Sequence, residues 1–279
     1  MKPRTHMHAR VQVLVVGGIM SGAGACGPMS GTGGRAVDFE LAFEVGASIE
    51  APFTSSAGWE IQLDEADIAL GPVWLYENAP AQSRAEGPDS GWLAGLHELL
   101  IPTAWAHAGD DFFDGGRLLG EFLEQRAVSL RDGDGGEAGA ARGVAGNVRS
   151  VSLVLDPPSS VTTGDAEALG DAQMWVSGRA QRELEGGGLE VVDFYGHLRL
   201  DEDARELRGI PANFDLDDDG RLVLRVDARR WLDEAQFDRL ETPDAEGRYE
   251  IGPNTQPAVA WTLAARNANS YAIAWAPAE

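Results

Sequence analysis

The sequence predicts a mainly β protein, with an antiparallel β-sandwich or barrel-like domain and one or two short helices. Apolar and polar residues alternate in short runs along most of the chain from residue 37 onward. Clusters of Gly, Pro and Asp separate these runs, as turns between strands do. Long helical patterns between the runs are missing, which argues against parallel βαβ units. Hydrophobic residues make up 43% of the chain, enough for a sizeable core.

The first predicted strand covers residues 37–45, where Val37, Phe39, Leu41 and Phe43 share one face opposite acidic residues. The same alternation continues through residues 59–77. Later predicted strands cover residues 126–131, 148–156, 172–181, 189–201, 221–231, 258–266 and 271–277. Two stretches are predicted as helices, 91–100 and 117–125, and residues 77–91 and 132–146 are predicted as the longest loops.

The N-terminal segment has the three-part pattern of an export signal. Lys2, Arg4 and Arg10 form a short basic region, and a mostly apolar stretch follows at residues 11–25. That stretch is shorter than the roughly 20 apolar residues that a membrane-spanning helix needs. It ends in the small residues Ala-Gly-Ala directly before Cys26, the only cysteine of the chain. One cysteine excludes an internal disulfide and a cysteine-based zinc site.

The small residues before Cys26 resemble the lipobox of bacterial lipoproteins, although Ala23 stands where that family prefers Leu. The resemblance implies cleavage before Cys26, lipid attachment to its sulfur, and acylation of the new amino terminus. With Gly27 next in the chain, it also implies an outer-membrane lipoprotein facing the periplasm or the exterior. The expected organisation is a signal peptide at 1–25, a lipid anchor and flexible tether at 26–36, and a single β-rich domain at 37–279. An ordinary signal peptide cut nearby is the alternative.

The balance of charge limits the partners. The formal net charge is −23, with 45 acidic residues against 22 Lys and Arg. Such a chain lacks the basic face that a nucleic-acid backbone requires. It is also unsuited to electrostatic docking on anionic lipid. We therefore expect no nucleic-acid partner and contact with membrane through the lipid anchor alone, while the protein or small ligand that it binds is not identified by the sequence.

The segment 104–116 is the first candidate metal site. It holds His107, Asp110, Asp111 and Asp114 within eight residues, and imidazole with carboxylate can bind zinc or copper. His97 or His197 is expected to complete the set from elsewhere in the fold. The alternative is structural, since histidine in a loop can bond to backbone and Asp before Gly commonly forms turns.

A second candidate site is the segment 215–220, which resembles the start of a calcium loop. Asp215, Asp217 and Asp219 occupy alternate positions before Gly220. The twelfth position is Val226, where an EF-hand has a bidentate Glu. The alternative prediction is a β-hairpin that pairs residues 213–217 with 221–227 around the Asp-Gly turn.

Common catalytic motifs are missing from the sequence. It has no GxSxG nucleophile elbow, no Gly-Lys-Ser/Thr phosphate loop and no GxGxxG in a strand–helix context. We therefore favour an exported, lipid-anchored β-domain that binds a ligand or divalent metal. A binding protein is expected rather than an enzyme. The alternatives are a periplasmic glycan hydrolase using a carboxylate pair such as Asp201 and Asp203, and a purely structural envelope protein. One or two exposed tryptophans can stack on sugar.

Three stretches, GWEIQLDEADIALGPVWLYE, AHAGDD and VRSVSLVLD, resemble uncharacterised secreted lipoproteins of myxobacteria-type genomes. That group often reads AHPGH where this chain has residues 106–110. The resemblance implies that His107 matches the first histidine of the motif and that Asp110 replaces the second. It implies no particular activity.

Overall fold

A computed structural model describes residues 34–80, 113–131 and 139–277 of the chain. The described residues from Gly34 onward belong to one compact unit. The strands are β1 (Ala36–Val45), β2 (Phe53–Thr54), β3 (Glu60–Leu70), β4 (Val73–Tyr76), β5 (Leu118–Phe122), β6 (Arg126–Ser129), β7 (Gly139–Val144), β8 (Gly146–Val154), β9 (Met174–Leu184), β10 (Gly188–Leu198), β11 (Glu206–Leu216), β12 (Gly220–Val226), β13 (Tyr249–Glu250) and β14 (Tyr271–Pro277). The helical segments are α2 (Gln256–Ala265) and the short 3-10 turns η1 (Glu202–Ala204), η2 (Ala228–Leu232), η3 (Phe237–Arg239) and η4 (Ala268–Ser270).

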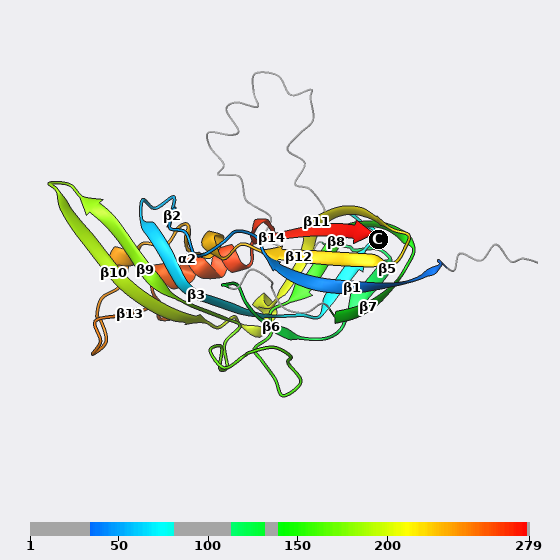
Figure 1. Cartoon of the computed structure of the whole chain (residues 1–279), viewed down its shortest axis with the longest axis horizontal. Helices are drawn as coiled ribbons and strands as arrows, with labels where there is room; N and C mark the ends of the chain where they lie inside the picture. The colour runs from blue at the N-terminus through cyan, green and yellow to red at the C-terminus, as the bar shows by residue number, and fades with distance from the viewer. Residues whose placement is uncertain (1–33, 81–112, 132–138, 278–279) are drawn as a thin grey trace, which may run out of the picture. The chain divides into compact units, whose positions relative to one another are not determined.

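The strands form two sheets, which confirms the predicted mainly β class (Figure 1). The eight-stranded sheet, called the barrel sheet below, has the order β11-β8-β4-β5-β7-β1-β12-β14. Its edge strands β11 and β14 approach each other, with Phe214 stacked on Trp275 at a ring-centroid distance of 5.4 Å, so the sheet almost closes. The second sheet, called the small sheet, has the order β13-β10-β9-β3-β2, and β6 pairs with β3.

At residues 37–43 the buried side chains alternate along the strand as predicted. Val37, Phe39, Leu41 and Phe43 are all buried in β1, while Asp38 and Glu40 are exposed. Along β3 the buried positions change from odd to even numbers. A register shift between Leu63 and Glu65 explains the change, because the bulge leaves one residue unpaired and turns the following side chains over.

One predicted helix and one predicted strand have the wrong type, and the predicted loop at 132–146 contains β7 and the first residue of β8. Residues 117–125 were predicted as a helix, but β5 lies there between β4 and β7, with Leu119 and Phe122 buried. Strand pairing on both sides of so short a segment outweighs its helical propensity. Residues 258–266 were predicted as a strand, but they fall within and just after helix α2. Thr255 caps that helix by accepting a hydrogen bond from the Ala258 N–H at 3.3 Å, and a proline lies in its first turn. The predicted helix at 91–100 lies outside the described residues.

The predicted hairpin of residues 213–217 with 221–227 is also wrong. β11 pairs with β8, whereas β12 pairs in parallel with β1 and antiparallel with β14. The C-terminal strand β14 takes the place beside β12 that a hairpin would have given to β11. The predicted strand at 221–231 ends at Val226, and its last residues form η2.

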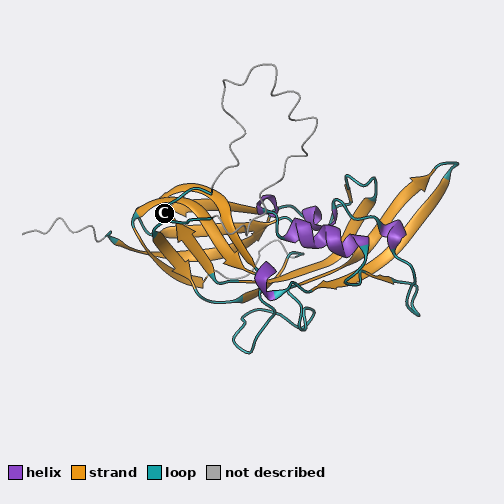
Figure 2. Cartoon of the chain, turned by 180° about the vertical axis from the view of Figure 1, so that it is seen from behind, coloured by secondary structure: helices purple, strands orange, loops and turns teal. Residues whose placement is uncertain are grey.

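The helical segments α2, η2 and η3, together called the helical layer below, cover one face of the small sheet (Figure 2). Aromatic side chains fill the layer between them: Phe194 of β10 lies 4.7 Å from Phe237 of η3, and Trp59 lies 5.5 Å from the same ring. Trp231 of η2 and Trp261 of α2 stack 6.1 Å apart, and both are fully buried. Because this face belongs to the core, the other face of β9 and β10 is left to solvent.

Candidate ligand-binding surface

The first metal set is only partly within the described residues. His97, His107, Asp110 and Asp111 lie outside them, as does the lipidation candidate Cys26. Asp114 is exposed and forms a turn: its Oδ1 accepts from the Gly116 N–H at 3.0 Å, and its carbonyl accepts from Asn78 Nδ2 at 3.2 Å. This is the structural role left open for Asp114 by the sequence. Zinc or copper binding through His107 stays a prediction.

His197 lies on β10 in the small sheet, whereas Asp114 lies just before β5 in the barrel sheet. Within residues 34–80, 113–131 and 139–277, no three His, Cys, Asp or Glu side chains are grouped closely enough to hold a metal ion. Among the described candidates, the fold thus gives His197 and Asp114 separate local roles.

The calcium candidates do not converge either. Asp215 is on β11, where its Oδ1 accepts a hydrogen bond from Asn147 Nδ2 at 2.7 Å. Asp217 and Asp219 lie in the exposed connection to β12. The neighbouring Asp218 pairs with Arg35 at 3.0 Å. The three alternate carboxylates make no ligand cluster in the part of the chain described by the structure.

The carboxylates Asp201 and Asp203 flank the start of η1 and are exposed. A glycosidase acid needs a raised pKa, which burial usually supplies. Elsewhere, the Arg199 hydrogen bond and charge lower the pKa of Asp171, and hydrogen bonds from the backbone at Arg248 lower that of Asp244. Such carboxyl groups are suited to ion pairs and hydrogen-bond acceptance.

The solvent side of the small sheet gathers more chemistry than the predicted sites. Register places Trp175 opposite His197, Ser177 opposite Tyr195, and Arg179 opposite Asp193 on alternate rungs of β9 and β10. Because side chains alternate along each strand, these six lie on the same face. Glu65 of β3 is paired with Ser177 and extends the row. We call these seven residues the aromatic face.

The Glu65 carboxylate connects the rows. Its Oε2 accepts hydrogen bonds from Trp175 Nε1 at 3.0 Å and from Ser177 Oγ at 3.1 Å. The Trp175 ring lies 4.3 Å from the His197 ring and 6.1 Å from the Tyr195 ring, both tilted. Its other contacts are with the small buried cluster of Ala69, Ala127 and Leu169. Trp175 is therefore held in one orientation while still half-exposed.

His197 and Tyr195 present polar atoms beside that ring. His197 Nε2 lies 3.0 Å from the Ala168 carbonyl oxygen, and since a carbonyl only accepts, Nε2 is the donor of this hydrogen bond. Burial raises the pKa of the Tyr195 phenol, and the nearby carboxylates of Glu250 and Asp244 add to this effect. A tyrosine phenol keeps its proton at neutral pH even at its ordinary pKa of about 10, so Tyr195 is a hydrogen-bond donor there.

Each arginine on or beside this face has an acidic partner. Arg179 pairs with Asp193 at 2.6 Å, Arg199 donates to Asp171, and Arg248 donates to Asp244 at 3.1 Å. The Arg248 guanidinium also lies 4.8 Å from the centre of the Tyr195 ring. These cations are compensated within the chain itself.

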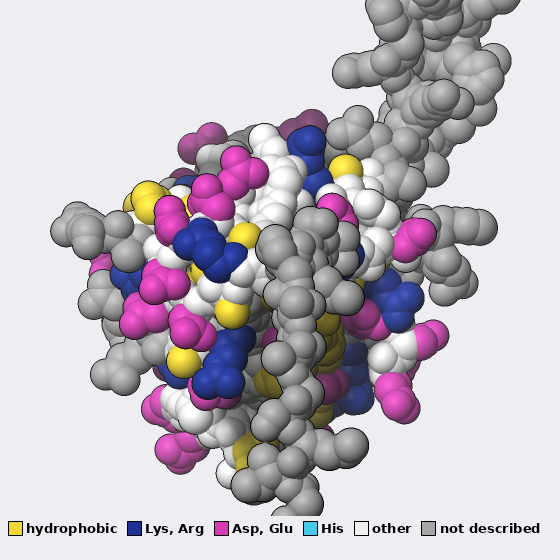
Figure 3. Space-filling view, turned by 90° about the vertical axis from the view of Figure 1, so that its right-hand side faces the viewer, with side chains coloured by type: hydrophobic (Ala, Val, Ile, Leu, Met, Phe, Trp, Pro, Cys, Tyr) yellow, Lys and Arg dark blue, Asp and Glu magenta, His cyan; other side chains and the backbone are white. Residues whose placement is uncertain are grey.

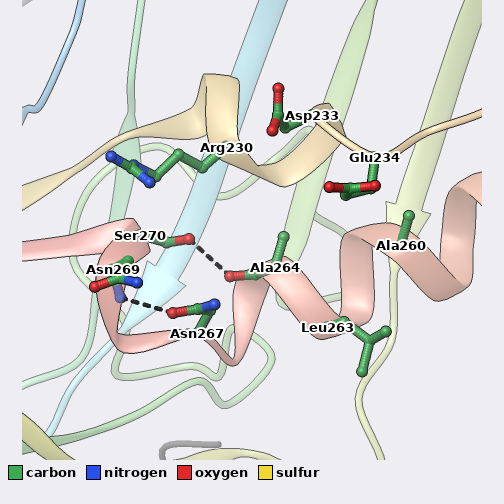
Figure 4. A pocket seen from close by; sticks show the side chains of 9 residues that line it. All are labelled: Arg230, Asp233, Glu234, Ala260, Leu263, Ala264, Asn267, Asn269 and Ser270. Carbon is green, nitrogen blue, oxygen red and sulfur yellow. Dashed lines mark hydrogen bonds between the residues drawn. The ribbon is translucent and has the colours of Figure 1, made fainter. Parts of the chain in front are cut away.

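A separate pocket of about 370 Å³ lies between η2 and the end of α2 (Figure 4). Arg230 and Asp233 line one wall, while Leu263 and Ala264 line the other. Its polar turn is already satisfied internally, because Asn267 Oδ1 accepts from the Asn269 N–H and Ser270 Oγ donates to the Ala264 carbonyl. We consequently regard this pocket as a packing feature of the helical layer.

The end of the barrel sheet carries a broad hollow of about 590 Å³ between Asp38, Arg142 and Arg221. Acidic and basic side chains are intermingled over the barrel side of the molecule (Figure 3). Several of them form surface pairs, including Arg142 with Asp38 at 3.8 Å. Exposed pairs of this kind contribute about 0–1 kcal/mol and indicate a solvated surface.

Comparisons with protein families, with curated proteins and with solved structures find no match to this chain. No helix in the described part of the chain is both long and apolar enough to cross a bilayer.

Sequence reasoning named His197 but not its neighbours Trp175, Tyr195, Ser177 and Glu65. The signal for four of these five was present in the alternation of residues 174–181 and 189–198. A short turn at Gly186–Gly187 connects the two runs and sets their register. When the residues of β9 and β10 are paired one by one, starting at the turn, Trp175 comes opposite His197. The position of Glu65, in contrast, depends on the bulge in β3.

Proposed function

We propose that this protein is an exported, lipid-anchored cell-envelope protein whose β-domain binds a ligand through the aromatic face. The basic start, the apolar stretch at 11–25 and Cys26 support export and anchoring. A single acyl chain gives only marginal membrane attachment, so the diacylglyceryl and N-acyl groups implied by the resemblance would together give a stable anchor.

The observation that carries the binding function is the composition of the aromatic face. On β1 the exposed positions before Leu41 include the acidic residues Asp38 and Glu40. On β9 and β10 the outward positions instead include Trp175, Tyr195 and His197. Aromatic rings with hydrogen-bonding groups around them are typical of recognition surfaces. This argument favours a binding protein over the purely structural alternative.

A binding role also fits better than hydrolysis. The carboxylates Asp201 and Asp203 are both exposed at the start of η1, whereas the general acid of a glycosidase usually lies in a partly apolar, water-excluding site. On the aromatic face, Glu65 Oε2 accepts hydrogen bonds from Trp175 Nε1 and Ser177 Oγ. The second carboxylate oxygen of Glu65 is an acceptor for a ligand that donates hydrogen bonds.

Intact mass and fractionation of the native protein test the anchoring proposal. We expect the chain to begin at Cys26, to carry the mass of a diacylglyceryl group and an N-acyl chain, and to co-fractionate with outer membrane. A Cys26→Ser variant is expected to lose that mass and to leave the membrane fraction. Recovery of wild-type protein that still begins at Met1 in the cytosol would overturn the proposal.

A further inference from the structure

We propose that the ligand of the aromatic face is a neutral saccharide, bound with Trp175 beneath a sugar ring and with Glu65 accepting from its hydroxyl groups. This inference rests on the proposed binding function and adds its chemical class. It follows from the rigidity of the rings, the polar atoms beside them, and the compensation of nearby charge.

The rings are fixed before any ligand arrives. Trp175 is held by the hydrogen bond to Glu65, by contact with the Leu169 cluster and by the His197 ring at 4.3 Å. Binding to such a ring costs little side-chain entropy. The apolar C–H face of a pyranose can then lie on the indole, while its hydroxyl groups point outward to the rim.

Hydrogen-bonding groups of both kinds surround the ring. Glu65 Oε2 already accepts two hydrogen bonds, and its second carboxylate oxygen provides further acceptor sites. Tyr195 supplies a phenol that donates hydrogen bonds at neutral pH, and Ser177 Oγ lies on the same rung. Sugar hydroxyls donate and accept, so this mixed set matches them more closely than it matches a purely apolar ligand.

Charge decides between a neutral ligand and a charged one. Arg179, Arg199 and Arg248 already pair with Asp193, Asp171 and Asp244, so a polyanion would have to displace a carboxylate of the chain. The Tyr195 ring, a possible contact for a cationic peptide, already has the Arg248 guanidinium 4.8 Å from its centre. A neutral polyhydroxyl ligand displaces neither arrangement.

The test is calorimetric titration of the full-length mature protein in detergent. The probes are a panel of neutral hexasaccharides (cellohexaose, maltohexaose, mannohexaose and chitohexaose), oligogalacturonate as the anion, and oligolysine as the cation. We expect at least one neutral hexasaccharide to bind and neither charged probe to do so. Trp175→Ala is expected to weaken binding about tenfold or more, as the loss of a central aromatic contact does. Glu65→Gln is expected to weaken it about threefold to tenfold through the lost charged acceptor.

Two controls keep the test decisive. Trp74→Ala removes a half-buried tryptophan from β4 in the other sheet and is expected to leave affinity unchanged. Trp175→Phe keeps an aromatic ring if the alanine variant unfolds, and is expected to retain part of the affinity. Binding of oligolysine alone, abolished by Trp175→Ala, would overturn the saccharide class but leave the proposed binding function standing. Binding of no neutral hexasaccharide, or binding insensitive to Trp175, would overturn the inference itself, whereas the Cys26 experiment tests anchoring independently.

Discussion

Two arginines on β9 allow a matched test of what attaches the β9–β10 hairpin to the helical layer. Arg182 donates to Glu190 at 2.7 Å and to Asp238 of the η3 turn at 3.1 Å. Its guanidinium also lies 4.3 Å from the centre of the buried Trp59 ring. Arg179, three residues earlier, forms one comparable pair with Asp193 on the solvent side. The side chain of Arg182 is 29% exposed and that of Arg179 is 59% exposed.

The expected losses follow from these contacts. Arg182→Ala removes a partly desolvated cation–π contact of about 1–2 kcal/mol. It also removes two half-buried ion pairs of about 0.5 kcal/mol each and the packing of the arginine stem. We expect a total loss of about 2–3 kcal/mol in the free energy of unfolding. Arg179→Ala removes one exposed pair, so its expected loss is about 0.2–1 kcal/mol.

Urea denaturation of the three proteins at equal ionic strength measures both losses. In thermal unfolding, the Arg182→Ala loss corresponds to a decrease in Tm of roughly 5–10 °C for a domain of this size. Arg182→Lys separates charge from shape, since lysine keeps the charge but loses the planar fork, and we expect it to recover less than half of the loss. Equal losses for Arg182→Ala and Arg179→Ala would refute the assignment of the hairpin attachment to the Trp59 contact.

Three further predictions concern stability. Thr255→Ala should cost about 1 kcal/mol of unfolding free energy because it removes the N-cap of α2, while Thr255→Ser should retain most of it in the same urea assay. Gly164 and Gly170 both have positive φ, but a Cβ at Gly164 would collide with the Ala127 carbonyl, whereas a Cβ at Gly170 would meet open space. Gly164→Ala should therefore lower Tm clearly more than Gly170→Ala. Equal decreases in Tm would contradict the packing around Gly164. Burial raises the pKa of Tyr271, whose phenol donates to the Ala265 carbonyl at 2.7 Å, so its stabilising effect should be full below the ordinary tyrosine pKa of about 10 and be lost as pH rises above it. Urea midpoints between pH 8 and 11.5 should then fall more steeply for the wild type than for Tyr271→Phe, and parallel curves would rule out this contribution.

The alternation of residues along the strands predicts part of the aromatic face. Alternation alone predicts that Trp175 and Ser177 share one side of a strand, and the Gly-rich turn brings them opposite Tyr195 and His197. What alternation does not predict is which side is buried. That depends on the helical layer, where Phe237 covers Phe194 and turns the aromatic face outward.

The sequence by itself determined the β class and the inner face of β1, because period-2 burial is a local property of an extended chain. Tertiary structure decided the type of β5 and the neighbours of β12. The segment 118–122 becomes a strand only because β4 and β7 flank it, and β14 separates β12 from β11 although it is the last strand in the sequence. These outcomes depend on pairing between residues that are distant in the chain, and periodicity within a short window carries no information about such partners.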